Sequence, residues 1–414
     1  MDVLQYFCHP LETLALLKLR WWGCEAVHAK CDMKKMEEDR QLCYSMLKQT
    51  SRSFSAVIMA LESDLGYAVC IFYLVLRALD TIEDDMSIPL DVKLPLLRSF
   101  HKNLHIPGWN YLDSREKDAV VLNNFHVISA QFRRLAKGYQ DVISDTCHRM
   151  AEGMVVFLEK NSVVDTYQEW DQYCHYVAGL VGIGLSRLFS ASQLEHPAVA
   201  EREHLSNSMG LFLQKTNIIR DFHEDIRDQR RLWPAEVLRH TGNPHLTLDD
   251  LLLQDNRPAA LSCLDELVGN GLTHVPDVME YLHAIRTPSV FAFCAIPQVM
   301  AMATLERCFN NPTIFTGKVK IRRGESAFII NNCTDMAAVH ELFRFYTNKI
   351  MWKMERAGRL PQAETFKRSL RAAGAWQPVN RWSSGLVDGV VIALVVVALW
   401  KHWTLGRGYL RGRL

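Results

Sequence analysis

The sequence contains the motif Asp-x-x-Glu-Asp twice, and each copy ends a long stretch with helical periodicity. The first copy, Asp80–Asp84, continues the apolar run 68–79, and the second, Asp221–Asp225, follows a helical pattern over 205–219. Positions i, i+3 and i+4 share one helix face, so each copy gathers three carboxylates. Carboxylates and substrate phosphates are the ligands that Mg²⁺ prefers. The pair therefore predicts two helices that face each other across one cavity and hold several Mg²⁺ ions and a diphosphate.

One copy alone would be better explained by an acidic helix end in solvent than by a metal site. The second copy lies 141 residues later and again has an arginine just ahead, Arg220 in the place that Arg77 has before the first copy. Two unrelated acidic helix ends are then the weaker explanation.

Helical periodicity continues through most of the chain. Neither a G-x-G-x-x-G turn nor a P-loop occurs. The expected fold is all-α, with one large helical domain around a central cavity. The patterns predict helices over 32–59, 116–160, 165–189, 261–310 and 337–373, with a loop and a short helix over 234–256.

Composition restricts the class of protein. The chain has 414 residues, of which 49% are hydrophobic and 22% charged, with a formal net charge of +1. No global charge favours nucleic acid as a partner. The 11 cysteines are scattered without C-x-x-C spacing, so they indicate neither a zinc site nor a disulfide framework.

The stretch 173–185 has three glycines within six residues, at 179, 182 and 184. Glycines weaken a helix, so their presence needs a reason. They could open room beside the helix for an apolar chain, with Val177, Gly182 and Leu185 on the cavity wall, or they could permit close helix packing. The sequence alone leaves both readings open.

The segment 315–325 alternates basic and apolar residues between two glycines and has four cations within 318–323. It is expected to be an exposed, mobile flap. An anionic ligand would give these cations a role, and a solvated surface loop is the alternative. The hydroxyls and arginine of 50–54 could likewise contact a phosphate, or serve as a helix cap.

The C-terminal segment 386–405 has 20 residues and contains 12 apolar residues in a row, 389–400. Trp382, Trp400 and Trp403 supply aromatic groups of the kind found at membrane interfaces. A single membrane span is favoured, and a membrane hairpin or surface attachment remains open. The expected division is an N-terminal segment 1–30, a catalytic domain 31–375, a linker 376–385, an anchor 386–405 and a basic tail 406–414.

Together with the two acidic motifs, the segments 173–182, 293–300 and 319–324 make the chain resemble the squalene and phytoene synthase family, from about Lys48 to about Glu325. The resemblance implies the class I isoprenoid synthase fold. It also implies head-to-head condensation of two farnesyl diphosphates through presqualene diphosphate, then reduction by NADPH to squalene. The implied metal cofactor is Mg²⁺ (or Mn²⁺), and no nucleic acid is expected as a partner. The chain is expected to be a monomer at the endoplasmic reticulum membrane, with its catalytic domain in the cytosol.

The resemblance carries over site residues position by position. Tyr173 matches the family's catalytic tyrosine, and the second motif departs from the family pattern at Phe222 and His223. The metal ligands are expected to be Asp80, Glu83, Asp84, Asp221 and Asp225, with Asp80, Asp84, Asp221 and Asp225 also assigned to catalysis. Substrate contacts are expected from Ser51, Arg52, Ser53, Tyr73, Arg77, Gln214 and Asn217, and NADPH contacts from Arg52, Arg77, Arg220, Lys320 and Arg322.

The chemistry requires a dry wall around an allylic carbocation, because water would quench it. Phe291 and Phe293 are candidates for that wall, since aromatic faces also stabilise cations. Tyr173 is the candidate base, alone or with released diphosphate as the proton acceptor. Two alternatives remain open: a phytoene or dehydrosqualene type of synthase that needs no NADPH, and a membrane-anchored interaction protein without catalysis.

Overall fold

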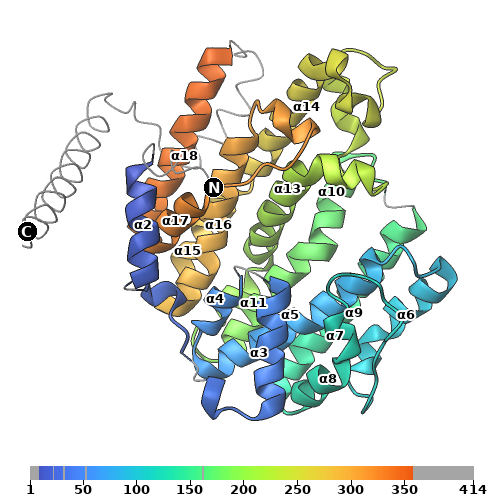
Figure 1. The fold of residues 1–414 in the computed structure, drawn as a ribbon, viewed down its shortest axis with the longest axis vertical. Helices are drawn as coiled ribbons and strands as arrows, with labels where there is room; N and C mark the ends of the chain where they lie inside the picture. The colour runs from blue at the N-terminus through green and yellow to red at the C-terminus, as the bar shows by residue number, and fades with distance from the viewer. Residues whose placement is uncertain (1–8, 22, 31–32, 52–53, 161–162, 358–414) are drawn as a thin grey trace, which may run out of the picture.

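The computed structural model describes residues 9–21, 23–30, 33–51, 54–160 and 163–357. Within these ranges the chain is helical and has no strand, only one isolated bridge between Val163 and Arg231. The expected all-α class is therefore confirmed. Figure 1 shows the first half of the chain mainly in the lower part of the molecule and the second half mainly in the upper part, with the first described helix at the left beside the C-terminal ones. Expected anchor residues 386–405 lie outside the described residues.

The α-helices are α2 Pro10–Trp21, α3 Glu38–Ser51, α4 Phe54–Met59, α5 Ser63–Asp84, α6 Leu90–Asn103, α7 Val120–Asn123, α8 Phe125–Arg133, α9 Lys137–Glu159, α10 Tyr167–Cys174, α11 Leu180–Ala191, α12 Ala198–Glu201, α13 Glu203–Arg227, α14 Arg257–Leu272, α15 Val275–Ala284, α16 Pro288–Cys308, α17 Arg323–Asn332 and α18 Met336–Ala357. A π-helical turn, His175–Gly179, joins α10 to α11. Short 3₁₀ turns are Glu25–Val27, Met33–Lys35, Ala235–Thr241, Asp249–Leu252, Gln254–Asn256 and Pro312–Phe315.

Several expected helices are divided in the structure. The single helix expected over 116–160 is wrong, because α7, α8 and α9 replace it. At the first break, the Asn124 side chain donates from Nδ2 to the carbonyl of Val120 at 2.9 Å. At the second break, Ala136 has an extended ψ of 144°. The region 261–310 likewise forms α14, α15 and α16 rather than one helix. A local side-chain hydrogen bond such as that of Asn124 competes with continuation of the helix.

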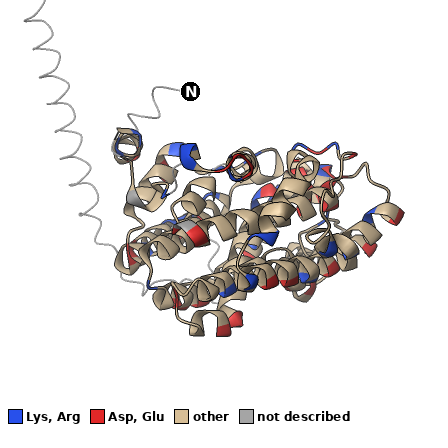
Figure 2. Cartoon of the chain, turned by 90° about the horizontal axis from the view of Figure 1, so that it is seen from below, with Lys and Arg blue, Asp and Glu red and all other residues tan. Residues whose placement is uncertain are grey.

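Two helices form the centre of the hydrophobic core. In α5 and α16, the windows Asp64–Asp84 and Pro288–Cys308 have a mean hydropathy of 1.7 and 1.5 and are long enough to cross a membrane. However, 83% and 78% of these windows are buried inside the protein. A helix that is apolar on all sides is typical of the core of a large protein. Charged residues of both signs are interspersed along the helices, in keeping with the small net charge (Figure 2).

The glycines of 179–184 permit close helix packing. A Cβ added at Gly179 would meet Asn207 Oδ1 at 2.0 Å, and one at Gly182 would meet the carbonyl oxygen of Ser206 at 2.2 Å. Both partners belong to α13. On the facing side, a Cβ at Gly210 would overlap the carbonyl of Ala178 at 2.2 Å. Of the two readings that the sequence left open, the structure supports close packing, although Gly182 also borders a cavity.

Candidate active site

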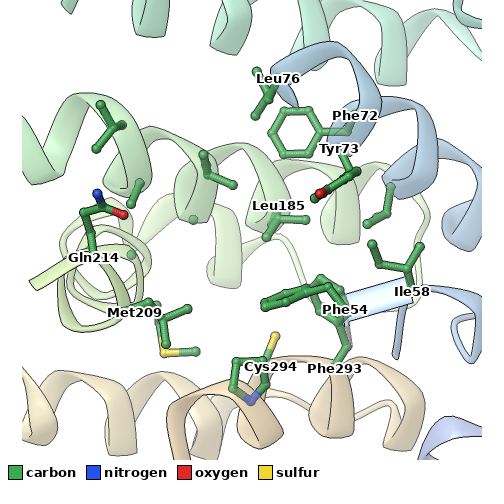
Figure 3. Close-up of a pocket in the computed structure, with 18 of the residues that line it drawn as sticks. Phe54, Ile58, Phe72, Tyr73, Leu76, Leu185, Met209, Gln214, Phe293 and Cys294 are labelled. Carbon is green, nitrogen blue, oxygen red and sulfur yellow. The ribbon is translucent and has the colours of Figure 1, made fainter. Parts of the chain in front are cut away.

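A cavity of about 330 Å³ lies between α4, α5, α11, α13 and α16. Aromatic rings occupy one end: Phe54 and Phe293 meet edge to face at 6.4 Å, and Phe189 meets Phe293 at 5.9 Å. Gln214 lies at the other end (Figure 3). The cavity is also lined by Arg77, Asp80 and Asn217. Its wall is therefore mainly apolar, with a few polar and charged groups that could hold a polar head group.

Most of the expected substrate residues line this cavity: Tyr73, Arg77, Val177, Gly182, Leu185, Gln214, Asn217 and Phe293. The structure brings them together from four α-helices, α5, α11, α13 and α16, and from the π-helical turn that holds Val177. Phe291 is buried in α16 but is not among the lining residues. Ser51 donates its hydroxyl to the carbonyl of Leu47, and Arg52 and Ser53 lie outside the described residues.

The first acidic motif is at the C-terminal end of α5, where it borders two cavities. Asp80 lines the apolar cavity, whereas Glu83 and Asp84 line a second, more polar cavity of about 800 Å³. Burial raises the pKa of Asp80 to about 7, although Arg77 opposes that shift from 3.7 Å. Burial and the neighbouring carboxylates, Asp84 first, raise the pKa of Glu83 to about 8. Asp80 and Glu83 are partly buried and Asp84 is exposed, and carboxylates gathered so closely are stabilised by a bound cation.

The second motif lies near the C-terminal end of α13. Asp225 is 6% exposed, and burial raises its pKa to about 7 despite the nearby Arg230. Asp221 pairs with Arg220, the preceding residue, whose Nε donates to it at 2.8 Å. Neither Asp221 nor Asp225 is among the lining residues of the two cavities.

Arg230 joins the two motifs. Its Nη1 donates to Asp84 Oδ1 at 2.8 Å, and its Nη2 donates to Asp225 Oδ1 at 2.9 Å. One cationic group therefore bridges carboxylates from both motifs, so the two motifs face each other across the Arg230 side chain. Sequence reasoning missed Arg230, and the only signal available was a pair of arginines one turn beyond the second motif, at 230 and 231.

The donor set fits Mg²⁺, since it consists of hard carboxylate oxygens. Within the described ranges, however, no three His, Cys, Asp or Glu side chains lie close enough together to hold a metal ion by themselves. Oxygen ligands from outside the chain, such as phosphate oxygens, would have to complete the coordination shell. This is the usual arrangement for Mg²⁺ sites that bind phosphate substrates.

Tyr173 lines the polar cavity together with Glu83, Asp84 and Arg230. Its side chain is 6% exposed and packs edge-on against Phe157 at 5.1 Å. Burial raises the pKa of Tyr173 well above its usual value, and the charge of Glu83 adds to the shift. The phenol is therefore a proton donor at neutral pH and not a base on its own.

An ion pair between a buried lysine and an exposed aspartate connects the helix of Tyr173 to that of the second motif. Lys215 of α13 is 1% exposed and contacts Asp171 of α10 at 2.5 Å. The same ammonium group donates to Asn270 Oδ1 at 2.6 Å and lies 4.8 Å from the ring centroid of Trp170. These contacts fix α10 against α13, and with it the position of Tyr173.

Phe222 and His223, where the second motif departs from the family pattern, do not take part in the carboxylate face. Phe222 is 1% exposed and packs against Trp233 and Phe315, with ring centroids 4.0 and 5.6 Å away. Phe222 therefore has a core-packing role, which a phenyl ring can fill without a hydroxyl.

The cations of the flap point in different directions. Lys318 pairs with Glu224 in the second motif, so the flap lies against the end of α13. Lys320 is exposed and lowers the pKa of Glu224 together with Lys318, whose hydrogen bond is the main cause. Arg322 is instead engaged with Glu12 of α2, to which its Nε donates at 2.8 Å. Any bound anion would compete with Glu12 for Arg322.

An all-helical fold with two facing carboxylate motifs and an apolar cavity defines a class of proteins that handle apolar substrates with anionic head groups. The model of the squalene/phytoene synthase family matches residues 47–325. The chain is 51% identical to the squalene synthase of Rattus norvegicus over 84% of this chain and 83% of the relative, and 44% identical to squalene synthase 1 of Arabidopsis thaliana over 86% and 88%. It is similar to the solved complex of TcSQS with a ligand, with a TM-score of 0.77 and 44% identity over 81% of this chain and 98% of that one.

The chain therefore belongs to the squalene/phytoene synthase family. Within that family it is of the squalene synthase type, a farnesyl-diphosphate farnesyltransferase.

Proposed function

We propose that the chain joins two farnesyl diphosphates head to head through presqualene diphosphate and reduces the product to squalene with NADPH. One observation supports this most directly. The wall of the 330 Å³ cavity combines aromatic rings, among them Phe54 and Phe293, with the charged groups of Asp80 and Arg77. That combination suits a long apolar chain whose diphosphate lies at the acidic motif.

Mg²⁺ would neutralise the developing charge of the leaving diphosphate. Asp80, Glu83 and Asp84 would hold it on one side, and Asp221 and Asp225 on the other. Arg77, 3.7 Å from Asp80, would help to orient the diphosphate. The nucleophile for the resulting allylic cation is the double bond of the second farnesyl group, and the apolar wall excludes water from it.

A proton must leave when the cyclopropane closes. Because burial keeps the Tyr173 phenol neutral, the phenol would act as a proton relay. Its hydroxyl accepts the proton from carbon only as it passes its own proton to an oxygen of the released diphosphate. Arg230, beside Glu83 and Tyr173, would hold that diphosphate in the polar cavity.

NADPH would supply the hydride that ends the reaction. Arg77 and Arg220 lie near the acidic motifs, and Lys320 lies on the flap that contacts Glu224 through Lys318. These positions suit a cofactor laid along the end of α13. The chain would act as a monomer at the endoplasmic reticulum membrane, attached by residues 386–405.

Product analysis tests the proposal. The full chain is incubated with farnesyl diphosphate and Mg²⁺, with and without NADPH. Squalene is expected with NADPH, and presqualene diphosphate or unreduced products without it. EDTA should stop both half-reactions. Formation of one unreduced hydrocarbon regardless of NADPH would instead indicate a dehydrosqualene or phytoene type of synthase.

A further inference from the structure

The outer face of α18 has a row of exposed aromatic and basic residues. Phe345, Lys349, Trp352 and Arg356 follow one another at helical spacing, and Phe345 and Trp352 are each 51% exposed. The Arg356 guanidinium lies 4.5 Å from the Trp352 ring centroid, and the Lys349 ammonium lies 5.2 Å from that of Phe345. Large apolar side chains that remain exposed in a row indicate a surface for interaction rather than a packing face.

A similar row lies on α2. Leu11, Leu14, Lys18 and Trp21 share one face by their spacing, and the three apolar side chains are 38%, 44% and 66% exposed. Both helices contact the same neighbour, because α17 packs against α2 and also contacts α18. Figure 1 shows all three along the same edge of the molecule. Together, the two rows form what we term the α2/α18 face.

The charge of this face is positive. On α2, Glu12 is taken up by Arg322, which leaves the basic residues Lys18 and Arg20 on the outside. On α18, Arg344 pairs with Glu341 and Lys353 pairs with Glu306, so the exposed row itself contributes the basic residues Lys349 and Arg356. Lys349 also contacts Glu306 at 3.3 Å, so Arg356 is the clearer cation of the α18 row. Aromatic and aliphatic side chains flanked by Lys and Arg are typical of helices that lie in an anionic membrane interface.

We propose that the α2/α18 face rests on the anionic phospholipid surface of a membrane. This inference rests on the proposed attachment of the chain by residues 386–405. Only 28 residues separate the end of α18 at Ala357 from Leu386. A chain of that length spans at most about 100 Å, so α18 stays within reach of any membrane that holds the C-terminal segment. Attachment at a second point would orient the catalytic domain relative to the bilayer.

The test uses the full chain reconstituted in vesicles of phosphatidylcholine and phosphatidylserine. The photo-crosslinking residue p-benzoylphenylalanine replaces Leu14 or Trp352, and illumination is followed by mass spectrometry of lipid adducts. Leu112, which is 69% exposed in the segment between α6 and α7, is the matched control. We expect lipid adducts at positions 14 and 352 to exceed those at 112 several-fold.

Charge dependence gives a second measurement. Each Lys or Arg near an anionic membrane strengthens attachment about five-fold, so Lys18→Glu combined with Arg356→Glu should sharply reduce the adducts at 352. Vesicles without phosphatidylserine should have the same effect.

Adducts at 14 and 352 no more frequent than at 112 would overturn the proposal, as would adducts to a second copy of the chain in place of lipid. Flotation of the vesicles separates this from the proposed anchor. A chain that floats without adducts at 14 and 352 keeps its anchor but lacks this surface. A chain that does not float with the vesicles contradicts both the proposed anchor and the α2/α18 surface. The proposed catalytic function is tested separately, by squalene synthesis.

Discussion

At the scale of single residues, Arg230 has the most direct influence on the acidic motifs. It contacts Asp84 and Asp225, which lie 141 residues apart in the sequence. In the absence of metal this guanidinium provides the opposite charge that two facing carboxylates need. If Mg²⁺ binds as proposed, it shares these carboxylates with Arg230 or displaces the Arg230 side chain.

Asp80→Asn and Asp225→Asn should each abolish most diphosphate release. Loss of charge stabilisation at a developing anion costs about 3 kcal/mol, or roughly a hundred-fold in rate. The measurement is Mg²⁺-dependent diphosphate release from farnesyl diphosphate. Asp141→Asn is the matched control, because Asp141 is 58% exposed on α9 and pairs with Lys137. Normal turnover in either motif variant would contradict the metal assignment.

Asp85 predicts a defined pH dependence of stability. Burial opposes its charge, but its carboxylate accepts hydrogen bonds from the hydroxyls of Ser87 and Ser114 and the backbone N–H groups of Ser87 and Arg115, which lower its pKa to about 2. Because the pKa of Asp85 is lower in the folded chain than its unfolded value near 3.8, the ionised carboxylate stabilises the fold above about pH 3.8. This stabilisation is lost as the pH falls toward 2.

Asp85→Asn should therefore lower the free energy of unfolding at pH 7 by about 1.5–3 kcal/mol, the contribution typical of hydrogen bonds to a charged group. The difference from the parent chain should shrink between pH 4 and pH 2. Urea unfolding at pH 7, 5 and 3 provides the measurement, and a difference independent of pH would contradict the role assigned to the charge.

At the scale of elements, the contact between the π-turn, α11 and α13 depends on glycine. Gly182→Ala would place a Cβ 2.2 Å from a backbone carbonyl that cannot rotate away, so the helices must separate. We expect a loss of roughly 1–3 kcal/mol or more in the free energy of unfolding. Gly138→Ala in α9 is the matched control, because its nearest neighbour would be 3.8 Å away. It should stabilise the chain by about 0.4–1 kcal/mol. Equal effects would show that close packing is not the reason for Gly182.

The contacts of the flap predict different effects for substitutions at Lys320 and Arg322. Lys320→Ala should raise the KM for NADPH about ten-fold or more, since a charge-assisted contact contributes roughly 1.5–3 kcal/mol. Presqualene diphosphate should accumulate at limiting NADPH, and squalene should return as NADPH is raised.

Arg322→Ala is compared with Glu12→Gln, because the two side chains are paired. If Arg322 contacts the cofactor, only Arg322→Ala raises the KM for NADPH. If it serves only to hold α2, both variants reduce stability alike and leave the KM unchanged. An unchanged KM in Lys320→Ala as well would place the cofactor near Arg77 and Arg220.

At the scale of the whole molecule, the sequence predicted the class of fold well, because helical periodicity is a local property. Eight of the residues expected to contact substrate line the apolar cavity, and their role as substrate contacts stays a prediction. Three features depend on tertiary contacts and were not predictable. These are the bridge made by Arg230, the polar cavity at Tyr173, and the pairing of Arg322 with Glu12 over 310 residues of sequence. The breaks near Asn124 and Ala136 arise from local contacts that periodicity does not register.

Truncation near Gln377 tests the division into domain and anchor. The shortened chain should be soluble and retain turnover, because every expected site residue precedes Arg323. The soluble fraction and squalene formation with NADPH are the measurements. A truncated chain that folds, as judged by circular dichroism, but lacks activity would show that the C-terminal segment belongs to the catalytic domain.

The apolarity of α5 has a consequence for biosynthesis. While the chain is being made, α5 leaves the ribosome before α9 and α11, which later contact it, have been synthesised. Until then α5 exposes an 18-residue window with a mean hydropathy of 1.7, which is apolar enough to cross a bilayer. Membrane-insertion machinery selects segments by their hydrophobicity, so burial of α5 must compete in time with insertion. The predicted anchor at 386–405 is synthesised last, when the core that hides α5 and α16 can already be complete.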